Sequence, residues 1–113
     1  SLRLLNDGDI FLGDELVVEV VLENLGNRTS TEVVMLFAQD RVASITPSMD
    51  KLKAYKRVLV DAGATKTVQL SVSTSELGFI GADHNYVVEP GMFGLRVKDH
   101  ITEFELKLKS YDP

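Results

Sequence analysis

Residues Leu16–Glu23, with the sequence LVVEVVLE, decide the fold class of this chain. Counted from Leu16, every second residue is a large aliphatic one, whereas the alternate positions include Glu19 and Glu23. Successive side chains of a strand point to opposite faces, so this period of two predicts a strand with one fully apolar face. Asn24–Asn27 then supplies the asparagine and glycine residues that a tight turn requires.

The same alternation predicts extended structure along most of the chain, and no stretch long enough for an ordinary helix has a helical period. The predicted strands are a first short one before residue 6 and then residues 16–23, 32–39, 52–60, 65–72, 86–88, 93–98 and 101–109. About seven short strands separated by turn signals indicate an immunoglobulin-like antiparallel β-sandwich. We expect residues 1–14 to form an N-terminal lead-in segment and residues 15–113 to form the domain.

Three local signals refine this prediction. Ser73–Glu76 places hydroxyl caps before an acidic residue, which predicts one short helical turn carrying Leu77. Strict alternation in the third long strand would place Lys56 among apolar residues, so a β-bulge near Tyr55 or an edge position is expected there. Asp83–Asn85 has the composition of a hairpin turn.

Composition excludes several classes of function. The chain has 113 residues, no cysteine and a net charge of −5. Without cysteine there is no disulfide framework and no thiolate metal site. The acidic balance argues against nucleic acid or an anionic membrane as the main partner. No apolar run is long enough to span a bilayer, and the N-terminus lacks a basic flank leading into an apolar stretch, so neither a membrane span nor a signal peptide is predicted.

No catalytic or metal-binding constellation is predicted. Paired catalytic carboxylates must converge on one site. Here Glu19 and Glu23 fall on the outer face of a strand, and no pair is marked as buried. Asn6–Asp9 resembles the opening of a calcium loop, but the residues at the later ligand positions do not fit. His84 and His100 lie in predicted turns with no metal-ligand spacing between them. We therefore expect no catalytic residue, no metal and no cofactor.

A basic cluster and a few aromatic residues remain as candidate binding features. The cluster, Lys51, Lys53, Lys56 and Arg57, could bind phosphate or nucleic acid, but the acidic total charge favours a solvated face with a structural or interdomain role. Sugar binding would require exposed aromatic rings, and the chain has no tryptophan. We expect the rings of Tyr55, Tyr86 and Phe93 at or near the core. Phe79, beside a loop, is the candidate exposed ring.

Two groups of segments carry a resemblance to a known family. They are EVVMLFA at 32–38 followed by LKAYKRV at 52–58 and DAG at 61–63, and then EL at 76–77 with YVVEPGMF at 86–93. In this order and spacing they resemble the fibronectin type III-like domain that ends many family-3 glycoside hydrolases, such as β-glucosidases and β-xylosidases. The sequence departs from that family at the Asp83–Asn85 turn and at Tyr86, where tryptophan is frequent.

The resemblance implies a non-catalytic accessory domain, because the family's catalytic residues lie upstream and no position of this chain matches their motifs. The parent protein would hydrolyse terminal β-linked sugars with retention, and this domain would brace its catalytic domains. A periplasmic or extracellular location is favoured. The alternatives are a free-standing carbohydrate-binding or adhesion module and a secreted structural immunoglobulin-like repeat.

One strand suggests where such a domain would dock. In residues 32–39, the apolar residues Val33, Met35 and Phe37 oppose a second apolar face, and Val17 and Val21 add apolar groups to a neighbouring outer face. A contiguous exposed apolar patch usually marks a contact surface. We expect these five residues to contact the catalytic domains of the parent chain. The isolated domain would then be able to self-associate through them.

Overall fold

A computed structural model describes residues 1–41, 51–80 and 84–108; for Phe79 and Ile80 it describes the backbone only. The described residues form strands and one short 3-10 turn. The elements are β1 Leu2–Leu4, β2 Ile10–Phe11, β3 Glu15–Glu23, β4 Ser30–Asp40, β5 Lys51–Val60, β6 Thr65–Ser73, η1 Thr74–Glu76, β7 Phe79–Ile80, β8 Tyr86–Val87, β9 Gly91–Val97 and β10 His100–Lys107. This part of the chain contains no helix of the length and apolarity that a membrane crossing needs.

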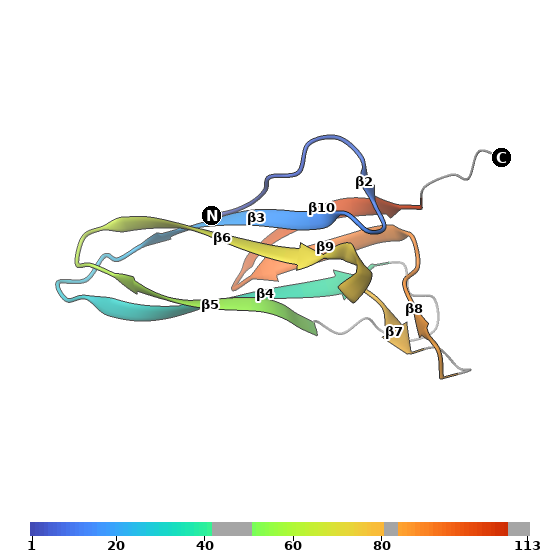
Figure 1. Cartoon of the computed structure of the whole chain (residues 1–113). Helices are drawn as coiled ribbons and strands as arrows, with labels where there is room; N and C mark the ends of the chain where they lie inside the picture. Colours follow the sequence, from blue (N-terminus) through green and yellow to red (C-terminus); the bar gives the residue numbers. More distant parts are fainter. Residues whose placement is uncertain (42–50, 81–83, 109–113) are drawn as a thin grey trace.

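The strands form two sheets that pack face to face (Figure 1). One sheet has the order β1-β3-β6, and the other has the order β2-β10-β9-β4-β5. Pairing is antiparallel except between β2 and β10, which run parallel. A separate β7–β8 hairpin projects from one end, so the predicted all-β sandwich is confirmed. Residues 2–4 and 10–11, within the expected lead-in segment, add β1 to one sheet and β2 to the other.

The core lies between the two sheets and follows the alternation seen in the sequence. Leu16, Val18 and Val20 of β3 point inward and are almost completely buried. From the other sheet, the rings of Phe93 and Phe104 stack with centroids 5.7 Å apart. The inward rows of the two sheets thus form one contiguous core.

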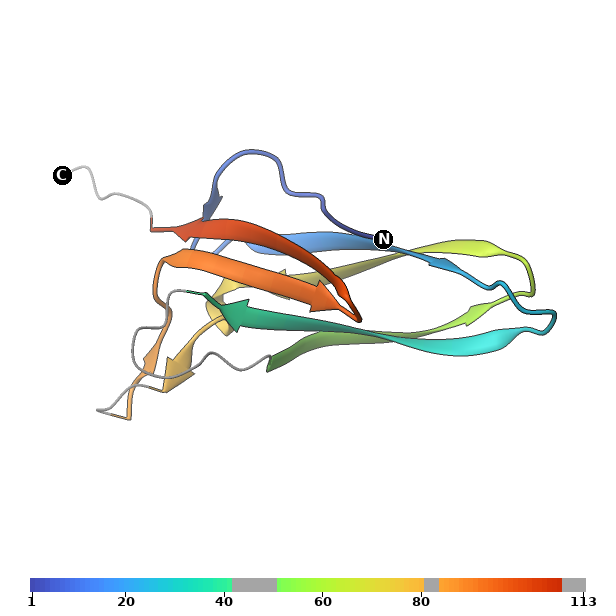
Figure 2. The ribbon, with the colours of Figure 1, turned by 180° about the vertical axis from the view of Figure 1, so that it is seen from behind.

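Both turns at one end of the sandwich cross from one sheet to the other (Figure 2). Asn24 connects them: its Nδ2 donates to the carbonyl oxygen of Val60 at 2.9 Å, and its own carbonyl accepts from Gly63 N at 2.9 Å. Gly63 has φ 71°, a conformation that glycine adopts without strain. The turn after β3 therefore places β3 and β4 in different sheets, although they are consecutive in sequence.

The predicted helical turn is present as η1. The side chain of Ser73 caps it by accepting from Ser75 N at 3.3 Å, and Leu77, directly after it, is buried. Thr74 is completely buried; its hydroxyl accepts from Gly13 N at 2.8 Å and donates to a backbone carbonyl of the loop before β3. These bonds attach the loop between β2 and β3 to the end of β6.

Candidate interdomain surface

Strand β4 presents apolar side chains on both of its faces. Its inward residues Val34, Leu36 and Ala38 belong to the core. Val33 and Met35 point away from the core and are exposed, with Met35 at 42%, and Phe37 is half-buried on the same side. Strand β4 is therefore apolar toward solvent as well as toward the core, as the sequence predicted.

Strand β5 extends this apolar row. The register places Tyr55 opposite Met35, Leu52 opposite Phe37 and Leu59 opposite Thr31, so these side chains share the outward side of the sheet. Tyr55 is 70% exposed and Leu59 is 60% exposed. The expectation that Tyr55 lies in or near the core is wrong. We refer to Val33, Met35, Phe37, Leu52, Tyr55 and Leu59 as the apolar outer face.

The β4–β5 pairing shifts at Lys53, and this shift sets the direction of the β5 side chains. The register changes between Leu36 and Phe37, which leaves Lys53 as the extra residue of a β-bulge. Strand β5 is also an edge strand of its sheet. The β-bulge and the edge position that the sequence suggested for this strand are therefore both present. Lys53 Nζ donates to the carbonyl oxygen of Glu76 at 2.6 Å, and burial together with the charge of Lys51 lowers the pKa of Lys53.

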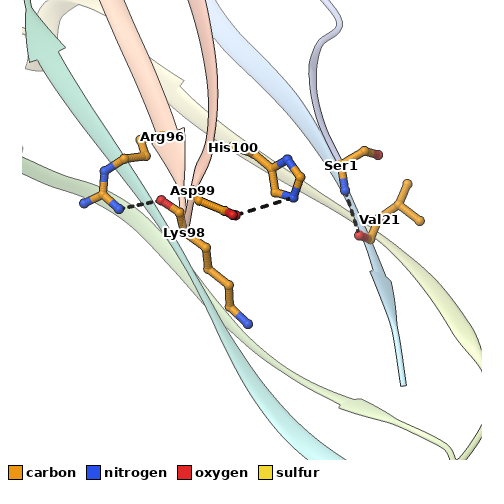
Figure 3. Close-up of polar contacts among 6 residues, drawn as sticks. All are labelled: Ser1, Val21, Arg96, Lys98, Asp99 and His100. Atoms are coloured by element: carbon orange, nitrogen blue, oxygen red, sulfur yellow. Dashed lines mark hydrogen bonds and ion pairs between the residues drawn. The ribbon is translucent and has the colours of Figure 1, made fainter. Parts of the chain in front are cut away.

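Arginine side chains border the apolar outer face on the side of β9. The Arg96 guanidinium lies 4.7 Å from the centre of the Phe37 ring, within the range of a cation–π contact. Its Nη1 donates to the carbonyl oxygen of Lys98 at 2.6 Å, which ties Arg96 to the β9–β10 turn (Figure 3). Next to it, Gly94 leaves the space that the Arg41 guanidinium occupies. An open hollow of about 240 Å³ lies between these residues and Ile101.

Val17 and Val21 do not belong to this surface. They are half-buried on the outer side of β3, in the three-stranded sheet, opposite Ser71 and Thr67 of β6. The inner faces of the two sheets pack against each other, so their outer faces point in opposite directions. The expectation that the two valines border the β4 surface is wrong, because the connection after β3 carries the chain to the other sheet.

The charged residues divide unevenly between the strands of the five-stranded sheet. Strand β5 contains Lys51, Lys56 and Arg57, all exposed, together with Lys53, and it has no acidic residue. The exposed acidic residues Glu103 and Glu105 lie on β10 instead, beyond β9. The edge next to Tyr55 is therefore basic on a chain whose net charge is −5.

No metal site assembles among residues 1–41, 51–80 and 84–108. These residues contain no group of three or more histidine, aspartate and glutamate side chains close enough to hold a metal. Glu19 forms an ion pair with Arg3 at 3.3 Å, which places it on the outer side of β3 as expected. His100 Nε2 lies 3.7 Å from a carboxylate oxygen of Asp99 (Figure 3), and His84 lies in the loop between β7 and β8 with φ 65°.

The other aromatic predictions have mixed outcomes. Phe93 is buried, as expected. The expectation for Tyr86 is wrong, since it is exposed and its hydroxyl donates to the carbonyl oxygen of Ser75 and accepts from Gly78 N. These two bonds hold the β7–β8 hairpin to η1. The side chain of Phe79 and residue Asp83 of the predicted turn lie outside the described part of the structure.

Comparisons with known proteins agree with this architecture. Residues 32–101 match the model of the fibronectin type III-like domain family. A β-xylosidase of Formosa agariphila is 34% identical over 93 residues, which cover 82% of this chain and 13% of the relative. A periplasmic β-glucosidase of Salmonella typhimurium is 27% identical over 81 residues, covering 72% of this chain and 11% of the relative.

Solved structures show the same likeness. A β-glucosidase of Listeria innocua in complex with gluconolactone superposes with a TM-score of 0.81 and 29% identity, over 95% of this chain and 16% of that one. A β-glucosidase involved in saponin metabolism from intestinal bacteria gives a TM-score of 0.87 and 28% identity, over 93% of this chain and 15% of that one. The chain thus spans only a small fraction of the length of the enzymes that it matches. Since the family model matches more than half of the residues, this chain belongs to the fibronectin type III-like domain family that β-glucosidases and β-xylosidases contain.

Proposed function

We propose that this chain is a non-catalytic accessory domain of a glycoside hydrolase, and that it braces the catalytic domains of its parent chain. The parent would hydrolyse terminal β-linked sugars. Two findings support the accessory role. The relatives are β-glycosidases of which this domain covers 10% to 16%, and the described residues form a sandwich around a single core. The bulk of the relatives' chains therefore lies outside the matched region.

The observation that carries the bracing role is the apolar outer face. A sandwich strand normally buries one face and leaves the other in water. Here six apolar side chains from two adjacent strands share the outward side. We assign this face, with Val33, Met35 and Phe37 at its centre, to the contact with the catalytic domains. In the isolated domain the same face would be available for self-association.

A second candidate function is carbohydrate binding. The observation in its favour is Tyr55, whose ring is 70% exposed among apolar neighbours. Sugar rings stack their C–H faces on such side chains. An independent module of this kind would bind polysaccharide without the rest of the parent enzyme, which separates it from the bracing role.

The test of the bracing role is the double substitution Met35→Ser and Phe37→Ser, made in the isolated domain and in the full-length parent enzyme. The control is Leu25→Ser, which alters a side chain that is 85% exposed in the turn after β3, away from this face. We expect the double variant to lower the melting temperature of the full enzyme while the isolated domain stays folded and self-associates less. Unfolding of the isolated double variant would place these residues in the domain's own core and contradict the proposal.

A further inference from the structure

We infer that Tyr55 anchors the contact with the parent enzyme, and that the partner surface is an apolar pocket with an acidic rim. The inference rests on the proposed function and adds the chemistry of the partner. It commits to one occupant, another domain of the same glycoside hydrolase chain.

The geometry of Tyr55 is that of an interface anchor. It has the largest side chain on the apolar outer face and the largest exposed fraction, and it stands opposite Met35 with Leu52 and Arg57 as its outward neighbours on β5. Tyrosine is enriched among the residues that dominate binding energy, because its ring is large and rigid and its hydroxyl can form a hydrogen bond. Such residues contribute most when surrounding contacts exclude water. The apolar neighbours of Tyr55 provide that surrounding.

The charges beside Tyr55 specify the rim of the partner surface. Arg57 is opposite Val33, which places it on the same outward side as Tyr55. Arg96 of β9 is opposite Phe37 and shares this outward side, whereas Lys51 and Lys56 are exposed at the edge of β5 opposite the inward residues Ala38 and Val34. No residue from Lys51 to Val60 is acidic. Charges across an interface are arranged so that their potentials are complementary. A partner that covers this edge would therefore present carboxylates around an apolar centre.

In the parent enzyme, the same observations favour another domain over a second copy of this domain as the occupant. A dimer that packed Tyr55 against its symmetry mate would bring two basic edges together, and like charges placed opposite each other cost free energy. A partner in the same chain is also favoured by its high effective concentration. The matched enzymes leave room for such a partner, because the matched region covers only 13% of the Formosa β-xylosidase and 16% of the Listeria β-glucosidase.

The experiment compares two substitutions with two controls in the full-length parent enzyme. The substitutions are Tyr55→Ala, which removes the anchor, and Arg57→Glu, which reverses the charge beside it. Their controls are Leu25→Ser and Arg28→Glu, which make similar changes at exposed positions of the turn after β3. Hydrogen exchange of the β4 and β5 amides and the melting temperature are measured, the latter over a series of salt concentrations.

We expect Tyr55→Ala to raise the exchange rate of the β4 and β5 amides by about tenfold or more, as for the loss of an interface anchor. Arg57→Glu should lower the melting temperature most at low salt and progressively less as salt screens the rim charges. Both controls should match the unaltered enzyme. In the isolated domain, where Tyr55 is already largely exposed, Tyr55→Ala should change the melting temperature little.

Four results would overturn the inference. If Tyr55→Ala and Arg57→Glu match their controls while Met35→Ser with Phe37→Ser weakens the full enzyme, the anchor is wrong and the bracing role stands. If all of these variants match the controls, the bracing role itself fails. If Tyr55→Ala lowers the stability of the isolated domain as much as that of the full enzyme, Tyr55 acts within the domain. If it abolishes binding to polysaccharide without changing the exchange rates, Tyr55 acts on carbohydrate instead.

Discussion

Replacement of Leu36 by alanine in the isolated domain tests which side of β4 faces the core. The Leu36 side chain is 0% exposed and lies among the inward residues of both sheets. Its truncation removes buried apolar surface and leaves a cavity, at a cost of about 2–5 kcal/mol. For a domain of this size, a loss of about 3 kcal/mol corresponds to a fall of roughly 10–15 °C in melting temperature.

Leu59 provides the matched control, because it is the same residue type on the adjacent strand but points outward and is 60% exposed. Leu59→Ala should change the free energy of unfolding by no more than about 0.5 kcal/mol, as for most surface substitutions. Chemical denaturation of both variants, followed by circular dichroism, gives the two free energies. A loss below about 1 kcal/mol for Leu36→Ala, or equal losses for the two variants, would refute the assignment of the inward and outward sides.

Three further predictions concern activity and local structure. The isolated domain should not hydrolyse aryl β-glycosides; turnover above a buffer blank that copurifies with the chain would contradict the accessory role. Thr74→Val should cost about 1–3 kcal/mol in chemical denaturation, because the completely buried Thr74 hydroxyl accepts from Gly13 N and donates to the carbonyl oxygen of Asp14; an unchanged midpoint would show that water replaces the hydroxyl. Gly78→Ala should loosen the β7–β8 hairpin and speed its proteolysis. An added Cβ would lie 2.5 Å from the carbonyl oxygen of Val87 and 2.6 Å from the Tyr86 ring. Unchanged proteolysis would mean that the hairpin adjusts without cost.

Local alternation was sufficient to predict the long strands and their inward residues. In β3 the period of two runs unbroken from Leu16 to Val20, and the buried residues are the predicted ones. The η1 turn was also predictable, because its Ser73 cap acts through bonds to residues close in sequence. Patterns confined to one element were therefore readable from the sequence alone.

The sequence predictions were wrong where the position of a residue depends on contacts beyond its own strand. Tyr55 points outward because it pairs with the outward residue Met35, and the sequence of one strand does not define that register. Val17 and Val21 were separated from β4 by a turn that crosses between sheets rather than closing a hairpin. Tyr86 is exposed, and its hydroxyl bonds to Ser75 of η1 and to Gly78, contacts that span 11 and 8 residues and that the strand pattern does not predict. Leu52, Tyr55 and Leu59 were missed as surface residues for the same reason.

The contrast between the two outer faces supports a specific role for one of them. The outer side of the three-stranded sheet alternates its two valines with polar residues, including Glu19 and its partners Arg3 and Gln69. This is the usual arrangement for a sheet with one face in water. The outer side of the β4–β5 pair instead gathers six apolar side chains with a basic edge. Since both faces belong to the same domain and have strands of similar length, general composition does not account for the difference. A surface that another domain covers in the parent enzyme does account for this difference. The β4–β5 face is therefore the surface on which to test for an interdomain contact.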